Sequence, residues 1–293
     1  PYVIRIRSLM LPALFGVSVS QINLLLDAII ASFLQNGSVS WLYYSDRLLE
    51  FPLGMFGIAI ATVILPNLSR QHALDDQKAF QGTVDWAVLL ICVLGIPSMF
   101  GLAVLAEPIL LTVFGHGRFT THDAAQSALA LMAYCAGLVH LMLIKVLAPA
   151  FYARQDVKTP VKIGIIAMVA NMVFNLMLAP FISYVGLALA TSMSGALNCW
   201  LLYRGLKSQG IYQLSPHSKV VIVKAVLAAM VMAVAIYVSI PSIAQFQQAG
   251  FSQRALWVGI GIGAAVPAYL AMLWLLGVRI ADFKRHSIAE SLA

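Results

Sequence analysis

Charged side chains are scarce in this chain. Asp, Glu, Lys and Arg make up 10% of its 293 residues, and hydrophobic residues make up 61%. Soluble domains contain about 25% charged residues, so the composition is not that of a soluble domain. It indicates an integral membrane protein.

Catalytic and metal-binding motifs are also missing. The three cysteines, Cys92, Cys135 and Cys199, lie in apolar stretches without a CxxC pattern, and we interpret them as small apolar fillers. The histidines show no HExxH spacing, and the sequence contains no GxSxG, P-loop or dinucleotide fingerprint. We therefore expect no enzyme and no cofactor.

The sequence contains long apolar stretches. Eight of them are long enough to cross a bilayer core, which takes roughly 20 helical residues. Their approximate ranges are 8–34, 40–66, 86–114, 124–152, 161–182, 186–203, 220–240 and 255–277. We predict an all-α, polytopic membrane protein with eight transmembrane helices.

The connections between these stretches differ in length and composition. Turn-forming residues such as Ser183 and Tyr184 separate most neighbours. The longer link at residues 67–85 mixes apolar and charged residues, which favours an interfacial amphipathic helix. A polar loop near residues 205–218 separates the first six spans from the last two, and predicts two parts, 1–212 and 213–293.

The net charge of +7 is distributed as in a membrane protein. The nine connecting or terminal segments alternate: those with odd numbers hold all the Lys and Arg outside the spans except Arg118 and Arg254. Cytoplasmic loops carry the excess of Lys and Arg, so we expect both ends of this chain in the cytoplasm. The alternation argues against a nucleic-acid partner.

Three charged residues, Asp46, Arg47 and Glu50, lie inside the second apolar stretch. A charge near the middle of a lone membrane helix costs about 3 kcal/mol or more, so such groups usually face a protein interior or a wet cavity. Wound at 100° per residue, they share one face with Ser40, Tyr43 and two glycines. One interpretation is a self-neutralising ion pair, because positions three and four apart meet on a helix. The other interpretation is that the planar guanidinium of Arg47 binds a phosphate.

Further polar residues interrupt four other stretches. Lys145 lies in the fourth and either snorkels to the cytoplasmic surface or lines a cavity. Asp27, Asn171, Asn175 and Thr191 lie in the first, fifth and sixth stretches. Their oxygens suit a small hard cation, and they equally suit hydrogen bonds between helices. The residues alone leave both alternatives open.

Two sequence runs carry a family resemblance. The run SDRLLEFPLG at residues 45–54, continued by GIAIATVILP at 57–66, resembles the MurJ/MviN family of lipid II flippases. The run ARQDVKTP at residues 153–160 resembles a cytoplasmic loop of the wider multidrug/oligosaccharidyl-lipid/polysaccharide exporter superfamily. The resemblance covers the whole chain and corresponds to the last eight of fourteen spans. Because the chain begins with Pro1, we expect a fragment that lacks the first six helices.

The resemblance implies the C-terminal lobe of a two-lobed flippase in the bacterial inner membrane. The substrate would be lipid II, an undecaprenyl pyrophosphate glycopeptide, moved by alternating access through a cationic cavity between the lobes. Its lipid tail would lie in a hydrophobic groove formed by the last two helices. The other partners would be membrane lipids and the missing N-terminal lobe. The cavity residues that match the family are Arg47, Asp46, Glu50, Ser40 and Lys145.

The resemblance also implies a sodium site. Asp27, Asn171, Asn175 and Thr191 match its positions, but Asn175 stands where that site has a second carboxylate. The departure leaves sodium, a proton and the membrane potential as alternative driving forces. A related exporter of O-antigen or polysaccharide lipid intermediates, or of drugs, is the nearest rival function. A membrane-embedded polyprenyl-phosphate glycosyltransferase is a more distant one, for which the longest outward loops offer only Asp123 as a carboxylate.

Overall fold

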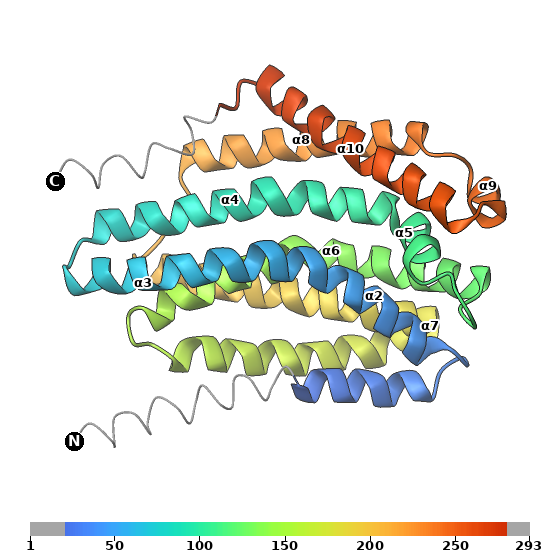
Figure 1. Cartoon of the computed structure of the whole chain (residues 1–293). Helices are drawn as coiled ribbons and strands as arrows, with labels where there is room; N and C mark the ends of the chain where they lie inside the picture. Colours follow the sequence, from blue (N-terminus) through green and yellow to red (C-terminus); the bar gives the residue numbers. More distant parts are fainter. Residues whose placement is uncertain (1–20, 280–293) are drawn as a thin grey trace.

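The computed structural model describes residues 21–279, and this part of the chain is almost entirely helical (Figure 1). The long helices lie side by side, and turns and short loops join them at the two ends of the bundle (Figure 1). The helices are Gln21–Ser32, α2 (Ser38–Pro52), the π-helix η1 (Leu53–Ile58), α3 (Ala59–Ala73), α4 (Gln77–Val104), α5 (Ala106–Val113), α6 (Thr121–Tyr152), α7 (Lys158–Ser208), α8 (Pro216–Ser239), α9 (Ile243–Gln248) and α10 (Phe251–Leu275).

Six helical stretches in residues 21–279 are long and apolar enough to cross a membrane. They are α2 through α3 as one stretch, α4, α6, α7, α8 and α10. The first predicted span, 8–34, lies partly outside the described residues, and its described part is the helix Gln21–Ser32. The prediction of an all-helical polytopic membrane protein is confirmed.

Helix α7 is a hairpin of two arms. The backbone leaves helical geometry at Ile182 and at Ser183, whose φ is 51°. The two arms then run side by side. The side chain of Asn171 in the first arm donates a hydrogen bond to Thr191 in the second. Gly186 permits the tight return, since a Cβ there would lie 2.8 Å from the backbone carbon of Leu178. The predicted turn between the fifth and sixth stretches is confirmed.

Two predicted boundaries are wrong. The third stretch, 86–114, is interrupted at Leu105, where α4 ends and the short α5 begins. The link 67–85 contains no separate amphipathic helix, because α3 continues to Ala73 and α4 already begins at Gln77. Two apolar residues of this link, Leu68 and Phe80, are buried, and their tertiary contacts extend both helices, whereas Leu74 at the turn is exposed.

Pro52 changes the geometry of the second span. Proline lacks the N–H that an α-helix needs and clashes with the preceding turn. The π-helix η1 follows Pro52 directly and widens the turn between α2 and α3. A π-helical turn inside a longer helix occurs frequently at functional sites. Its buried Gly57 lies against the side chain of Lys145 on α6.

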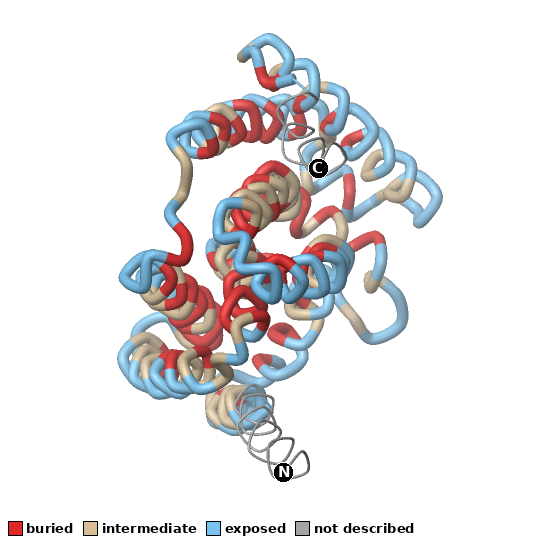
Figure 2. Tube along the Cα trace, turned by 90° about the vertical axis from the view of Figure 1, so that its left-hand side faces the viewer, coloured by how far each residue is buried: buried red, intermediate tan, exposed pale blue. Residues whose placement is uncertain are grey.

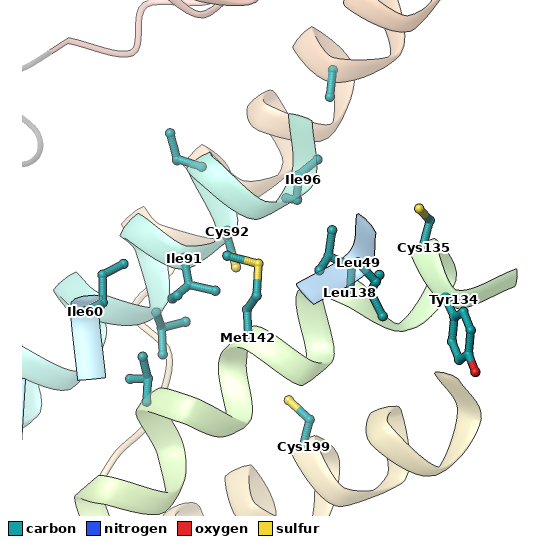
Figure 3. Close-up of a cluster of buried hydrophobic side chains, with 14 of the residues drawn as sticks. Leu49, Ile60, Ile91, Cys92, Ile96, Tyr134, Cys135, Leu138, Met142 and Cys199 are labelled. Carbon is teal, nitrogen blue, oxygen red and sulfur yellow. The ribbon is translucent and has the colours of Figure 1, made fainter. Parts of the chain in front are cut away.

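The core is built around α6, which packs against α2, α4 and α7. Figure 3 shows buried side chains from these helices converging, with Met142 of α6 pointing towards Ile91 and Cys92 of α4. All three cysteines are buried and form no disulfide. The interpretation of Cys92, Cys135 and Cys199 as apolar packing residues agrees with this burial.

Helices α8 and α10 form a pair on the α4 side of the bundle (Figure 1). The hydroxyl of Tyr269 in α10 donates a 2.8 Å hydrogen bond to the carbonyl of Val93 in α4. Many large apolar side chains on the outer faces of α8 and α10 are exposed, among them Val234 and Trp274. Exposed apolar residues on a membrane helix face lipid, so this pair presents a hydrophobic surface.

Candidate functional site

A cavity of about 750 Å³ lies between α2, α6, both arms of α7 and the helix Gln21–Ser32. Each wall is a helix face, because the lining residues recur at spacings of three and four. Leu141, Lys145, Ala148 and Tyr152 line it from α6, and Thr191, Ser194, Asn198 and Leu202 line it from the second arm of α7. Two loop-end residues, Val157 and Pro160, place part of it beside the connection from α6 to α7.

Three of the five predicted cavity residues line this space. Asp46 and Glu50 reach it from α2, and Lys145 reaches it from α6. Asp46 is half-buried, whereas Glu50 and Lys145 are exposed. Lys145 is among the lining residues, which is the position that its cavity alternative requires.

Arg47 lies beside the cavity, but it does not line it. Its Nη1 atom donates a 2.6 Å hydrogen bond to Oε2 of Glu50, and its guanidinium lies 4.9 Å from the ring centre of Tyr43. The side chains of Arg47 and Glu50 are each 51% exposed. The ion pair therefore forms at the rim of the cavity, where the side chain of Arg47 is open to a ligand.

Ser40 lies apart from these groups. It is exposed in the first turns of α2 and is not among the lining residues of the cavity. Winding the sequence as a helix places Ser40 and Glu50 on one face, but they are ten residues apart. At about 1.5 Å per residue, the separation along the axis is about 15 Å. On α2 the cavity lining begins at Asp46, so Ser40 lies beyond its end.

The charge of the lining is negative within the described chain. Asp27, Asp46 and Glu50 contribute carboxylates, and Lys145 contributes the one Lys or Arg side chain that lines the cavity between residues 21 and 279. Even with Arg47 at the rim, carboxylates outnumber cations. Residues 21–279 therefore do not by themselves form a cationic cavity.

The four predicted cation ligands meet in one hydrogen-bonded cluster. The side-chain nitrogen of Asn175 donates to Asp27 at 2.6 Å and to Asn171 at 3.2 Å. Thr191 donates to Asp27 at 3.4 Å. Asn175 is fully buried, and its Oδ1 atom has no hydrogen-bond partner among the described residues.

This cluster fits a small cation in its donor chemistry. A buried oxygen without a partner is costly, and carboxylate, amide and hydroxyl oxygens are the ligands that a hard cation takes. The described residues contain no group of three or more His, Cys, Asp and Glu side chains that would hold a metal ion. Any cation here would depend on amide and hydroxyl oxygens, with Asp27 as the charged ligand.

Sequence reasoning missed several polar residues that line the cavity, among them Gln21, Asn23, Ser194 and Asn198. Ser194 and Asn198 follow Thr191 at spacings of three and seven, which is the periodicity of a single helix face. That spacing is the signal by which they could have been found. Asn23 lines the cavity from the helix Gln21–Ser32, and its Oδ1 atom is buried without a hydrogen-bond partner in residues 21–279.

Both carboxylate oxygens of Asp123 accept hydrogen bonds at helix ends. Asp123 forms a capping box with Thr120 at the start of α6, and its Oδ1 atom accepts a 2.8 Å hydrogen bond from Trp41 of α2. Trp41 also packs against the ring of Tyr184 at the α7 turn. These bonds give Asp123 a structural role at the ends of α2 and α6.

With this geometry in view, comparison with known proteins identifies the family. The family model described as "Lipid II flippase MurJ" matches residues 1–255. The chain belongs to this family. The resemblance predicted from the two sequence runs is confirmed.

Two relatives illustrate the match. The chain is 56% identical over 284 residues to the "Probable lipid II flippase MurJ" of Vibrio cholerae, covering 97% of this chain and 54% of that protein. It is 38% identical over 292 residues to the "Lipid II flippase MurJ" of Burkholderia cenocepacia, covering 98% and 56%. The chain thus spans about half the length of the curated relatives it matches.

Solved structures share the fold. The structure described as "Lipid II flippase MurJ, inward closed conformation" superposes with a TM-score of 0.76 at 27% identity, covering 95% of this chain and 54% of that one. A MOP superfamily transporter from Pyrococcus furiosus superposes with a TM-score of 0.61 at 16% identity, covering 94% and 65%. At that identity, the second likeness is one of fold alone.

Proposed function

We propose that this chain is the C-terminal portion of a transporter that flips lipid II from the cytoplasmic to the periplasmic leaflet of the bacterial inner membrane. The observation that carries the proposal is the Arg47–Glu50 ion pair at the rim of the cavity, in a chain that belongs to the lipid II flippase family. Such a protein makes no covalent change in its substrate. It provides a wet path for a head group that hydrocarbon excludes.

Arg47 is suited to contact the pyrophosphate. Moving a charged phosphate through hydrocarbon is far costlier than moving sugars, so fixed positive charge is needed along the path. The guanidinium has five donors and uses one of them on Glu50. Because both side chains are half exposed, water screens their attraction, and a dianionic ligand can compete with Glu50 for the fork.

The acidic lining of the cavity supports a two-lobed arrangement. Within residues 21–279, Lys145 alone does not balance Asp27, Asp46 and Glu50 in the lining, so an anionic head group needs cations from outside this part of the chain. The relatives are about twice as long as this chain, and a second lobe would supply these cations. Alternating access then consists of one lobe rocking against the other around a shared cavity.

The hydrogen-bonded cluster around Asp27 supports a cation-binding site. A cation bound there would couple ion binding to transport. Asp27, Asn175, Asn171 and Thr191 would hold it through oxygen atoms. The ion would supply positive charge that neutralises Asp27 beside the acidic cavity. Sodium fits these hard oxygen ligands, and a proton on Asp27 would neutralise the same charge.

We further propose eight membrane crossings with both ends of the chain in the cytoplasm. The two arms of α7 count as two crossings, and residues 8–34 supply the first. Residues 1–212 would form the transport lobe and 213–293 a two-helix module. The exposed apolar faces of α8 and α10 would hold the undecaprenyl tail, which never needs to leave hydrocarbon.

Replacing Arg47 tests the proposal in the full-length protein. Arg47→Ala should fail to support growth of a flippase-depleted strain while it inserts at normal levels. Arg118→Ala, in the loop between α5 and α6, is the matched control and should complement. Normal growth with Arg47→Ala would refute the assignment. The lipid-linked precursor that accumulates on depletion separates lipid II transport from export of O-antigen or other polysaccharide intermediates.

A further inference from the structure

Asp85 is a buried carboxylate in α4 that the cavity does not use. It is 7% exposed. Its Oδ1 atom accepts hydrogen bonds from the hydroxyl of Tyr212 at 2.9 Å and from the backbone N–H of Ser215 at 3.1 Å. Its Oδ2 atom accepts one from the hydroxyl of Ser218 at 2.6 Å. One side chain of α4 therefore binds three groups in the linker and the first turn of α8.

These bonds fix the first turn of α8. Ser215 is the N-cap of that helix, and its own hydroxyl accepts the backbone N–H of Ser218. Hydrogen bonds to an ionised acceptor are about twice as strong as neutral ones, and a negative charge is favourable at a helix N-terminus. Tyr212 and Ser218 are each 1% exposed, so water cannot replace Asp85 as their partner.

Asp85 is one of a row of three α4 residues, four positions apart, that form hydrogen bonds to the linker before α8. Gln77 and Gln81, at spacings of four, each donate a side-chain hydrogen bond to the carbonyl of Gly210. The row thus binds the linker of residues 209–215 that joins α7 to α8, and buried positions in this linker are visible in Figure 2. The glutamine bonds are exposed, whereas the bonds of Asp85 to Tyr212 and Ser218 are buried. Asp85 is therefore the principal anchor.

We propose that Asp85 is a positioning residue that sets the placement of α8 and α10 relative to the transport lobe. It thereby keeps the apolar surface for the lipid tail in register with the cavity for the head group. The inference rests on the proposed function, because it assigns those two surfaces to two parts of one lipid. It predicts that losing Asp85 harms recognition of the tail and spares recognition of the head.

Asp85→Asn in the full-length protein tests this separation. Binding is measured with lipid II and with an analogue that has the same head group and a short, water-soluble tail. Asparagine removes the negative charge and accepts hydrogen bonds through one oxygen in place of two, so the attachment of α8 to α4 weakens. We expect the affinity for lipid II to fall about fivefold or more and the affinity for the short-tailed analogue to stay within about twofold. Unchanged affinity for lipid II, or an equal fall for both ligands, would overturn the inference.

Two further variants guard against loss of folding. Tyr212→Phe removes one donor and keeps the ring, so it should show a smaller, tail-selective loss; an equal effect on both ligands would again contradict the inference. Lys78→Ala, at an exposed position of α4 outside this row, is the matched control and should bind both ligands normally. If the unaltered protein binds neither ligand, the proposed function fails and the inference fails with it. If the unaltered protein binds both ligands and Asp85→Asn binds both with the same affinities, only the inference fails.

Discussion

Asp27 and Asn175 are 148 residues apart in the sequence, and the amide nitrogen of Asn175 donates a 2.6 Å hydrogen bond to the Asp27 carboxylate. The oxygen of the same amide is buried without a hydrogen-bond partner among the described residues. The cluster is thus half satisfied. A cation at this position would complete it.

Asn175→Asp should make the protein more dependent on sodium. Two carboxylates at hydrogen-bonding distance repel each other, so thermal stability without sodium should fall. Sodium should then restore it more strongly than it stabilises the unaltered protein, because the new carboxylate adds a charged ligand. The measurement is the melting temperature in detergent with sodium or potassium chloride at equal ionic strength. Equal melting curves in the two salts would contradict a cation site here.

Glu50→Gln should strengthen binding of the anionic head group. The variant removes the negative partner of Arg47 and keeps the size of the side chain. A ligand phosphate then no longer competes with a carboxylate for the guanidinium. We expect the affinity for a short-chain polyprenyl pyrophosphate to rise several-fold, with slower release and slower transport. Weaker binding by this variant would show that Glu50 itself holds the substrate.

Lys145→Cys should be accessible to a membrane-impermeant thiol reagent added from the cytoplasmic side. Lys145 is exposed and lines the cavity, whereas the native cysteines are buried and should give little background. Met142→Cys, one turn away on α6 and at a fully buried position, is the matched control and should stay unlabelled. Equal labelling at both positions would contradict the position of the cavity wall.

Gly137→Ala should destabilise the contact between α6 and α7. A Cβ at Gly137 would lie 2.6 Å from the Cα atom of Ser192, so the two helices must separate. We expect a loss of about 1–3 kcal/mol in the free energy of unfolding. Gly164→Ala is the control, because nothing lies within 4 Å of its added Cβ, and it should be neutral or stabilising by up to about 1 kcal/mol. Denaturant titration of both variants measures the difference.

Much of the fold could be predicted from local pattern. Apolar length identified the membrane class, and turn residues located the break at Ser183. The polar face of the second span brought Arg47 and Glu50 together, because a spacing of three on a helix is fixed by its winding. Boundaries at Leu105 and Gln77 were missed, because packing decides whether a helix breaks or continues there.

By itself, the sequence determined which residues share a face of each helix, since helical periodicity depends on the chain's own geometry. Only the tertiary structure decided which faces meet. It brought Asp27 to Asn175 and turned Lys145 into the cavity, because the rotation of each helix is set by the neighbours it packs against. It also gave Asp85 its three partners on a distant helix and linker, a relationship that no local pattern encodes.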